Sequence, residues 1–171
     1  LVFNAFIDKS IQELHNKKIK NLIIDVRYNG GGSQYPSIYL LQHLVDKAFI
    51  YYSKSEFEGK TETFYGEGVF QPNLNRFKGK VYFLIDGNGT STTGHFMSLV
   101  KSLNLGTIIG EELGSNQFCT AGQTLCRLKH TKLVVSIANN VHISSATNLP
   151  DDIGIRPDFY VTQNIDEYLN S

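Results

Sequence analysis

The sequence predicts an α/β fold with a mostly parallel sheet, crossover helices and a β-rich C-terminal part. Three short apolar runs, at 21–26, 81–86 and 107–110, have the length and composition of buried strands. Helix-like segments at 35–47 and 92–103 separate these runs. Strands that alternate with helices in this way run parallel and are joined by right-handed crossovers.

The first third of the chain has the clearest periodicity. Residues 2–18 place apolar side chains at helical spacing with polar residues between them, which predicts an amphipathic helix. The buried strand 21–26 follows and leads to three consecutive glycines, 30–32. The helix predicted over 35–47 begins almost directly after this glycine turn.

In the rest of the chain, segments with a clear secondary-structure pattern alternate with segments that have none. The run 49–53 predicts a strand, whereas 54–79 is polar, dotted with aromatic residues and without a sustained period. We interpret 54–79 as a variable excursion with hairpin character. Strand 81–86, helix 92–103 and strand 107–110 then complete the sheet. Short β segments at 124–128, 133–138 and 159–161 and a closing helix at 165–169 are predicted after it.

The composition is that of an ordinary globular domain. We expect residues 1–171 to form a single α/β domain, long enough to bury a substantial core. Sixteen basic residues balance sixteen acidic ones, so net charge favours neither nucleic acid nor a membrane surface. No apolar run approaches the roughly 20 residues needed to cross a bilayer, and no signal peptide is seen. Because the sequence begins inside an amphipathic pattern without an initiator Met, we expect it to be a fragment of a longer chain.

The cysteines and histidines indicate neither a definite disulfide nor a metal site. Cys119 and Cys126 are seven residues apart, a spacing that fits a disulfide pinning a hairpin and fits two free thiols about equally well. The histidines and cysteines show no metal-ligand spacing. The sequence therefore predicts neither a metal nor another cofactor.

The glycine turn is the first candidate binding feature. Consecutive glycines cost conformational entropy, so a chain keeps them where the backbone needs a positive φ or must approach something closely. At the carboxyl edge of a sheet, where a helix begins, free N–H groups can surround a negative charge. We predict an anion or oxyanion site at Gly30, Gly31 and Gly32. The alternative is a tight strand-to-helix turn that binds nothing.

A second loop of the same kind follows strand 81–86 and contains Ser91. In a parallel sheet both loops emerge at the same edge, where such folds place their sites. A serine at a strand-to-helix turn has an exposed hydroxyl beside the positive end of a helix, which suits an acyl-transfer nucleophile. The same position equally suits a helix cap.

Three motifs resemble those of a known family. Asn21 to Gly32 is similar to the strand and R-x-N-x-G-G signature of the C-terminal processing (tail-specific) and tricorn-type serine peptidases. Val81 to Glu111 resembles that family's strand, T-x-S-x-x-E, helix, strand and G-E block, and Gly154 to Val161 resembles its G-I-x-P-D-x-x-V. The motifs occur in order and cover most of the chain. The resemblance implies a crotonase/ClpP-like superfold and serine peptidase ancestry.

Catalytic roles follow from the resemblance residue by residue. It places the nucleophile on Ser91, or on Thr92 if the alignment slips by one position. The family's oxyanion hole combines one N–H of the glycine turn with the N–H that follows the serine. In this chain these are Gly31, or its neighbours Gly30 and Gly32, and Thr92.

Several positions depart from the processing-peptidase pattern. The family's catalytic lysine lies 25 residues after the serine, where this chain has Asn116. The acid of T-x-S-x-x-E is replaced by Gly94, and its threonine by Gly89. A Ser–Lys dyad is therefore not expected. We instead expect Asn116 and Glu111 on the substrate side of the site.

The tricorn-type branch offers a different base. It uses a histidine from an upstream segment and a late carboxylate, for which Asp151 is the candidate here. The histidine would then lie in the part that precedes this sequence. His95, four residues after Ser91, is a local substitute on the same side of the helix. Its structural alternative is an ordinary helix histidine.

Two hypotheses of different classes result. The leading one is a serine peptidase with a Ser nucleophile and a backbone oxyanion hole. The alternative is a catalytically inactive, peptidase-like binding module that holds extended peptides or apolar ligands, supported by Asn116 in place of lysine and Gly94 in place of the acid. A crotonase-like acyl-thioester enzyme would share the oxyanion geometry, but no feature for coenzyme A recognition is seen.

Partners and location follow the leading hypothesis. The expected partner is a polypeptide, extended or C-terminal, docked on an edge strand; neither nucleic acid nor a membrane span is expected, and an oligomer is compatible with the sequence. Members of this family are commonly exported in bacteria. The resemblance therefore implies a periplasmic, cell-surface or secreted location.

Overall fold

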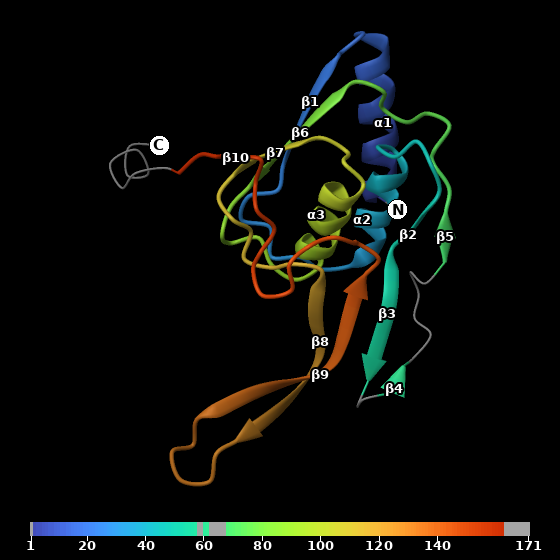
Figure 1. Cartoon of the computed structure of the whole chain (residues 1–171). Coiled ribbons are helices and arrows are strands. Elements are labelled where there is room, and N and C mark those ends of the chain that lie inside the picture. Colours follow the sequence, from blue (N-terminus) through green and yellow to red (C-terminus); the bar gives the residue numbers. More distant parts are fainter. Residues whose placement is uncertain (1, 58–59, 62–67, 163–171) are drawn as a thin grey trace.

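The computed structural model describes residues 2–57, 60–61 and 68–162. Figure 1 shows a body of helices and strands from which one long hairpin projects. In chain order the elements are α1 (Val2–Asn16), β1 (Asn21–Asp25), α2 (Gln34–Gln42), β2 (Phe49–Ile50), β3 (Tyr52–Phe57), β4 (Lys60–Thr61), β5 (Val69–Phe70), β6 (Lys80–Ile85), α3 (Thr92–Ser102), β7 (Thr107–Gly110), β8 (Phe118–Arg127), β9 (Val134–Ser144) and β10 (Phe159–Tyr160).

The central sheet is parallel, as the alternation of strands and helices predicts. Its order is β1-β6-β7-β10, and all three neighbouring pairs are parallel. Along β6, Val81, Phe83 and Ile85 are buried, because alternate side chains of a strand point to the same face. The turns after β1 and β6 consequently leave the sheet at the same edge.

The core lies between this sheet and the helices. α2 contacts α1 and α3, and α3 also contacts β8 and β9. Because α3 is enclosed on several sides, every residue from Thr92 to Val100 is buried. None of the helices in the described part of the chain is long and apolar enough to cross a membrane. The largest fully buried apolar side chains are those of Tyr51, Phe83, Leu41, Ile85, Met97, Leu99, Ile108, Leu113 and Val100.

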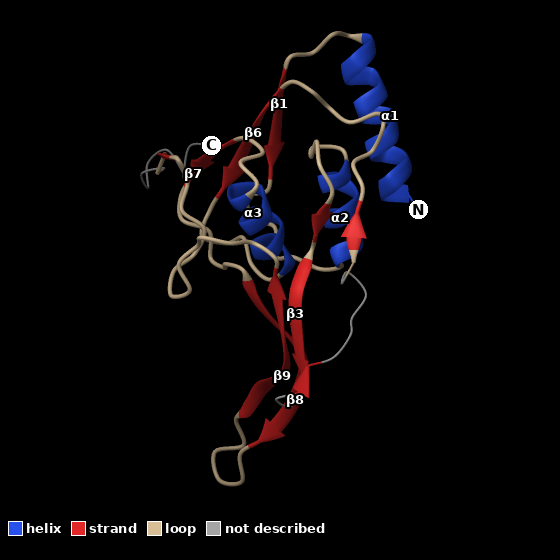
Figure 2. Cartoon of the chain, turned by 45° about the vertical axis from the view of Figure 1, so that its right-hand side comes forward, coloured by secondary structure: helices blue, strands red, loops and turns tan. Residues whose placement is uncertain are grey.

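A second sheet is antiparallel and has the order β4-β3-β9-β8. β8 begins and β9 ends beside α3, and between these ends the two strands project from the body as a long hairpin (Figures 1 and 2). This sheet contains the hairpin predicted within 54–79, formed by β3 and β4. The β-rich C-terminal part thus packs against α3 through β8 and β9.

The helix predicted over 35–47 is shorter in the structure. Ser33 caps its start, where the Ser33 hydroxyl accepts the Tyr35 N–H at 3.3 Å. The helix ends at Gln42, because the next N–H groups bond three residues back and tighten the last turn. His43 is fully buried at this point, with Nε2 3.3 Å from Asp8 Oδ1 of α1. The chain therefore leaves the helix where His43 reaches α1.

The strand predicted over 49–53 is two strands. Tyr51 is fully buried and interrupts the ladder, so Phe49 and Ile50 pair with β5 while Tyr52 begins the pairing with β9. The apolar run 49–53 thus contributes strands to two different sheets. The helix predicted at 165–169 lies outside the described residues.

β8 and β9 are longer than the predicted segments 124–128 and 133–138, and the length of β8 determines whether the two cysteines can pair. Cys119 and Cys126 lie on the same strand, β8, and both are free thiols. At about 3.3 Å per residue, seven residues of strand separate them by roughly 23 Å, so they cannot form a disulfide with each other. The disulfide alternative is wrong.

Asp158 connects the end of the chain to the sheet. Its Oδ2 accepts the Ile108 N–H at 2.8 Å and its Oδ1 pairs with Lys101 Nζ of α3. Partial burial alone would raise the pKa of this carboxyl, but the bonds from Lys101 and Ile108 outweigh it and hold the pKa below its ordinary value. A lowered pKa means that ionised Asp158 stabilises the fold above its ordinary pKa. This contribution is lost as pH falls through the folded-state pKa.

Replacing Asp158 by Asn should therefore lower the free energy of unfolding at pH 7 by about 1 kcal/mol, given that the carboxylate is partly exposed. The difference from wild type should shrink as pH falls through the folded-state pKa. Urea unfolding at several pH values measures both effects. Asp152→Asn is the matched control, since Asp152 is exposed, and it should leave stability unchanged. A difference that stays constant with pH would contradict this account.

Candidate active site

The turns after β1 and β6 are bonded to each other. The Asn29 carbonyl accepts the Thr90 N–H at 3.1 Å and the Thr93 hydroxyl at 2.9 Å. The Thr92 hydroxyl donates to the Gly32 carbonyl at 2.6 Å. The two loops that the sequence predicts at one edge of the sheet therefore lie side by side.

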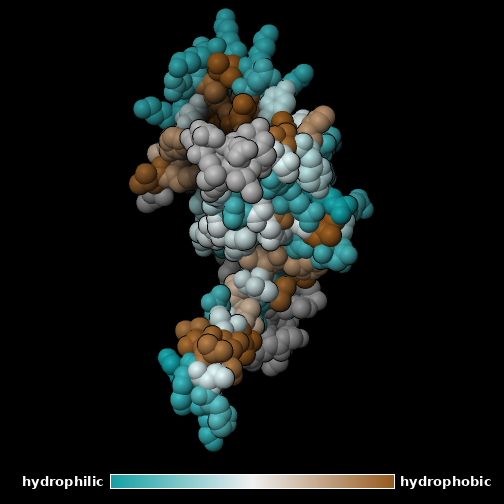
Figure 3. All heavy atoms as spheres, turned by 90° about the vertical axis from the view of Figure 1, so that its left-hand side faces the viewer, coloured by the Kyte–Doolittle hydropathy of each residue, from teal (hydrophilic) through white to brown (hydrophobic). Residues whose placement is uncertain are grey.

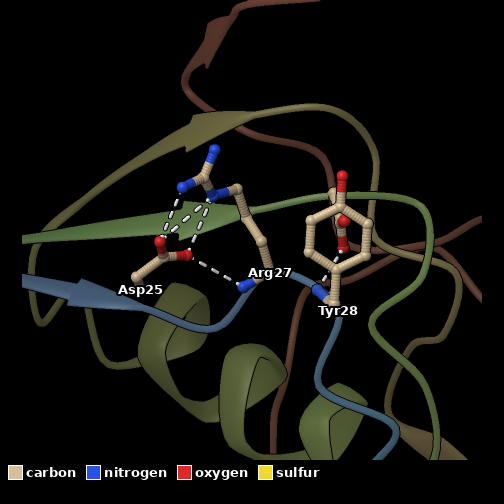
Figure 4. Close-up of polar contacts among 4 residues, drawn as sticks. Asp25, Arg27 and Tyr28 are labelled. Carbon is tan, nitrogen blue, oxygen red and sulfur yellow. Dashed lines mark hydrogen bonds and ion pairs between the residues drawn. The ribbon is translucent and has the colours of Figure 1, made fainter. Parts of the chain in front are cut away.

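Carboxylates hold the backbone of both turns. Buried Asp86 accepts the N–H groups of Tyr28, at 3.0 Å, and Asn88, at 3.2 Å. Asp25 and Arg27 form a two-pronged ion pair, with Nη2–Oδ2 at 2.7 Å and Nε–Oδ1 at 2.9 Å (Figure 4). The bonds from Arg27 keep the pKa of Asp25 below its ordinary value. Arg27 is thus a structural partner of Asp25.

Gly31 lies directly against Ser91. A Cβ at Gly31 would meet Ser91 Cβ at 2.6 Å, the Thr90 carbonyl at 2.7 Å and the Thr92 nitrogen at 2.8 Å. Its φ of +86° is also one that side chains rarely adopt. Space and backbone conformation both require glycine here, so the glycine turn and the candidate nucleophile are in contact.

Ser91 has a strained backbone. Its φ of 59° and ψ of −128° lie in a region that residues other than glycine seldom occupy, at a cost of about 1–3 kcal/mol. Ser91 precedes α3 but its side chain makes no capping hydrogen bond. The helix-cap alternative is therefore wrong. A serine held in strain at a sharp strand-to-helix turn is the arrangement that presents the nucleophile in α/β-hydrolases.

Ser91→Gly should be more stable than Ser91→Ala by about 1 kcal/mol, because glycine adopts this φ without strain. Urea unfolding of the two variants measures the difference. Thr90 is the matched control, since it lacks a positive φ. There the order should reverse, with Thr90→Ala more stable than Thr90→Gly by about 0.5–1 kcal/mol. The same order at both positions would show that Ser91 is unstrained.

Some of the backbone N–H groups around Ser91 already have a hydrogen-bond acceptor and others do not. Gly31 donates its N–H to Asn29 Oδ1 at 3.0 Å, so this amide is already bonded. Among the described residues, the N–H groups of Gly30 and Gly32 have no acceptor. Thr92 is the first residue of α3, and its N–H belongs to the helix end that has no internal partner. Free donors and the positive end of α3 thus surround the Ser91 turn.

Gly31→Ala should destabilise the protein by at least 2 kcal/mol, because the new methyl group overlaps the backbone of Thr90 and Thr92 in a strained φ. Gly30→Ala is the matched control: its Cβ would meet nothing within 4 Å. Its thermal midpoint should stay within a few degrees of wild type. Comparable losses in both variants would mean that the whole turn, not the contact with Ser91, is the sensitive feature.

His95 is bonded away from Ser91 in the described part of the chain. It is fully buried, its Nε2 bonds the His142 carbonyl at 3.0 Å, and its ring packs edge-on to Tyr52. Burial lowers its pKa to about 4, so the ring is neutral at pH 7. Within the described residues the Ser91 hydroxyl has one hydrogen-bond partner, and this is Cys119 rather than His95. The structure therefore favours the ordinary-helix alternative for His95.

Of the remaining predicted residues, Asn116 and Asp151 contact each other in a neighbouring loop, whereas Glu111 does not take part. The Asn116 side-chain amide donates to the carbonyls of Asp151 and Ile153, both at 3.0 Å. Gln117 Nε2 donates to Asp151 Oδ1 at 2.6 Å. In the described part of the chain Glu111 forms only a backbone bond near the site, from its N–H to the carbonyl at the end of β6. Asn116, at the position of the family's lysine, thus fixes the loop that contains Asp151.

Cys119 is the site residue that sequence reasoning missed. Its Sγ lies 3.3 Å from Ser91 Oγ, because β8 begins beside the start of α3. No local pattern signals this contact, since it depends on how the second sheet packs. A cavity of about 400 Å³ reaches the other side of the turn, where Gly31 and Thr92 meet apolar side chains from α1, β1 and α3. No group of three His, Cys, Asp or Glu residues in the described part is placed to hold a metal ion.

A strained serine lies against a glycine turn at the carboxyl edge of a parallel sheet, an arrangement that also presents the nucleophile in α/β-hydrolases. The model of peptidase family S41 matches residues 3–161, and the chain belongs to this family. This confirms the resemblance to processing and tricorn-type serine peptidases. No curated protein sequence matches the chain significantly.

Solved structures agree on the fold. The photosystem II D1 C-terminal processing protease is 19% identical, with a TM-score of 0.66 over 93% of this chain and 39% of its own. Mature CPAF is 14% identical, with a TM-score of 0.63 over 89% of this chain and 41% of its own. A lipoprotein from Streptococcus agalactiae is 15% identical, with a TM-score of 0.54 over 98% and 60%. The fold is the ClpP/crotonase-like one, and the chain spans 39–60% of these proteins.

Proposed function

We propose that this protein hydrolyses peptide bonds with Ser91 as the nucleophile. The observation that supports this most strongly is the conformation of Ser91, whose strained backbone is held against the glycine turn with its hydroxyl free of any capping bond. Membership of peptidase family S41 supports a serine-type peptidase. The substrate is then a polypeptide. We further propose an exported location, as the family resemblance implies.

The proposed mechanism uses main-chain groups around Ser91. The hydroxyl attacks the carbonyl carbon of the scissile bond, and the carbonyl oxygen becomes negatively charged. The Thr92 N–H and the Gly32 N–H are the proposed donors to this oxygen, because Gly31 is bonded to Asn29. Such donors act on charge that develops in the transition state, and one of them contributes about 3 kcal/mol to lowering the barrier.

The proton of Ser91 requires an acceptor other than His95. Asp151 accepts Gln117 through Oδ1, and its Oδ2 has no hydrogen-bond partner among the described residues. We propose that Asp151 orients a base through this oxygen. On the tricorn-type resemblance the base is a histidine from a segment upstream of this sequence.

Labelling with a fluorophosphonate tests the nucleophile. The protein should form an adduct located on Ser91 by peptide mass spectrometry, and Ser91→Ala should remove it. His95→Gln, checked for folding by circular dichroism, should label within about threefold of the wild-type rate. An adduct on another residue would overturn the assignment to Ser91. A hundredfold loss in folded His95→Gln would make His95 the base.

The alternative, an inactive binding module, is favoured by one observation. The Asn116 amide that replaces the family's lysine is engaged with the loop at Asp151 and Ile153, so no amine is near Ser91 at that position. A folded protein that binds peptides but shows neither an adduct at Ser91 nor hydrolysis of casein would favour this alternative.

A further inference from the structure

The outer half of the β8–β9 hairpin has an apolar face that no described part of the chain covers. We call residues 122–138 the arm. Opposite residues of an antiparallel pair share a face and successive residues alternate, so the pairings Cys126–Val135, Leu128–Leu133 and Thr124–Ile137 place these side chains together. The apolar face consists of Cys126, Leu128, Leu133, Val135 and Ile137, all of which are exposed.

The tip of the arm is basic. Arg127, Lys129 and Lys132 lie at or next to the turn, and the sequence has no Asp or Glu between Glu112 and Asp151. The whole chain has zero net charge, so positive charge is concentrated here and balanced elsewhere. Figure 3 shows apolar surface on the arm directly behind a hydrophilic tip. The arm therefore complements a partner with both apolar groups and negative charge.

The edge of the arm is open as well. β8 is the last strand of its sheet, and within the described residues it pairs only with β9. Edge strands are usually protected by charges, proline or a covering segment, but Phe118 to Cys126 has no charged residue and no proline. A free edge of this kind offers main-chain donors and acceptors to an added strand.

β8 connects this surface to the candidate nucleophile. It starts next to Ser91, where Cys119 Sγ contacts Ser91 Oγ at 3.3 Å, and runs for ten residues, roughly 33 Å, to the basic tip. A chain that pairs along β8 would therefore extend from the arm toward Ser91.

We propose that the arm is a docking site for an extended polypeptide with alternating apolar side chains and carboxylates near the tip. The polypeptide adds as a strand to β8, its apolar side chains extend the apolar face, and its carboxylates meet Lys129 and Lys132. This inference rests on the proposed peptidase function, for which it names the substrate class. A lipid surface fits the charge but makes no use of the main-chain edge, which is why a polypeptide is the favoured occupant.

Fluorescence anisotropy with synthetic peptides tests the docking site on the Ser91→Ala protein, which prevents cleavage. The probe is a fluorescein-labelled 12-residue peptide with alternating Val and Thr and Glu at both ends. It should bind at least tenfold more tightly than the same peptide with Lys at the ends. N-methylation of alternate amides should weaken binding at least tenfold, because it blocks strand pairing.

Variants of the arm provide matched controls. Leu133→Ser removes an apolar-face side chain that is 63% exposed and should weaken binding about tenfold. Leu125→Ser changes a side chain that is 68% exposed on the opposite face of the same arm, and binding should stay within twofold. Lys129→Glu with Lys132→Glu should reverse the preference toward the Lys-ended peptide. All variants should keep the circular dichroism spectrum and thermal midpoint of the parent.

Several outcomes would overturn the proposal. Equal affinity for both peptides, or equal effects of Leu133→Ser and Leu125→Ser, would exclude docking on the apolar face. If the protein binds no peptide but sediments with anionic phosphatidylglycerol vesicles in a way that requires Leu133, the occupant of the arm is a lipid surface. If analytical ultracentrifugation shows a dimer that Leu133→Ser dissociates, the occupant of the arm is a second copy of this chain. The fluorophosphonate result at Ser91 is independent of peptide binding, so failure of the function and failure of the docking site are distinguishable.

Discussion

The candidate site depends on one close contact, between the Cα of Gly31 and the side chain of Ser91. This contact forms because β1 and β6 are parallel neighbours, so the turns that follow them lie at the same edge of the sheet. A side chain at position 31 would overlap the Ser91 side chain and the backbone of Thr90 and Thr92. The hydroxyl, the free amides and the start of α3 take their positions from this contact.

Hydrogen bonds around the contact offset the strain at Ser91. The strained conformation costs about 1–3 kcal/mol, and each partly buried hydrogen bond contributes about 0.5–1.5 kcal/mol. Asn29 alone accepts from Thr90 and Thr93 and also holds the Gly31 amide through its side chain. Asp86 adds bonds to Tyr28 and Asn88. The surroundings thus over-determine a conformation that an isolated turn would abandon.

The sequence predicts the central sheet and both turns well, because local patterns decide them. Strands 21–26 and 81–86 read as continuous apolar runs, which is enough to locate them. The expectation that 21–26 is buried is wrong for β1, because β1 is an edge strand and its Ile23 is 64% exposed. The consecutive glycines at 30–32 mark where the backbone must come close. Strain at Ser91 has no local signature, and the local pattern leaves a helix cap open there; it is the family resemblance that selects Ser91 as the candidate nucleophile.

What the sequence leaves open depends on packing between distant segments. The early part of β8, Phe118 to Gln123, mixes apolar and polar residues without strict alternation and contains Gly122, so nothing local indicates that it pairs with β9. The contact of Cys119 with Ser91 follows from that pairing. The spacing of His95 from Ser91 suits a base. Its ring, however, is buried against Tyr52 and hydrogen-bonded to the His142 carbonyl. A helical spacing cannot show which neighbour competes for a side chain.

The long separation between bonded partners has a consequence for folding. Asn29 and Thr93 are 64 residues apart in the chain, and the turns on which they lie meet only after β1 and β6 have paired. Parallel pairing of this kind requires closure of a long loop and is therefore a late and slow event in folding. A newly made chain consequently has no assembled candidate site until the sheet has formed. On the proposed peptidase function, this order of events keeps the chain from cleaving itself or other nascent polypeptides.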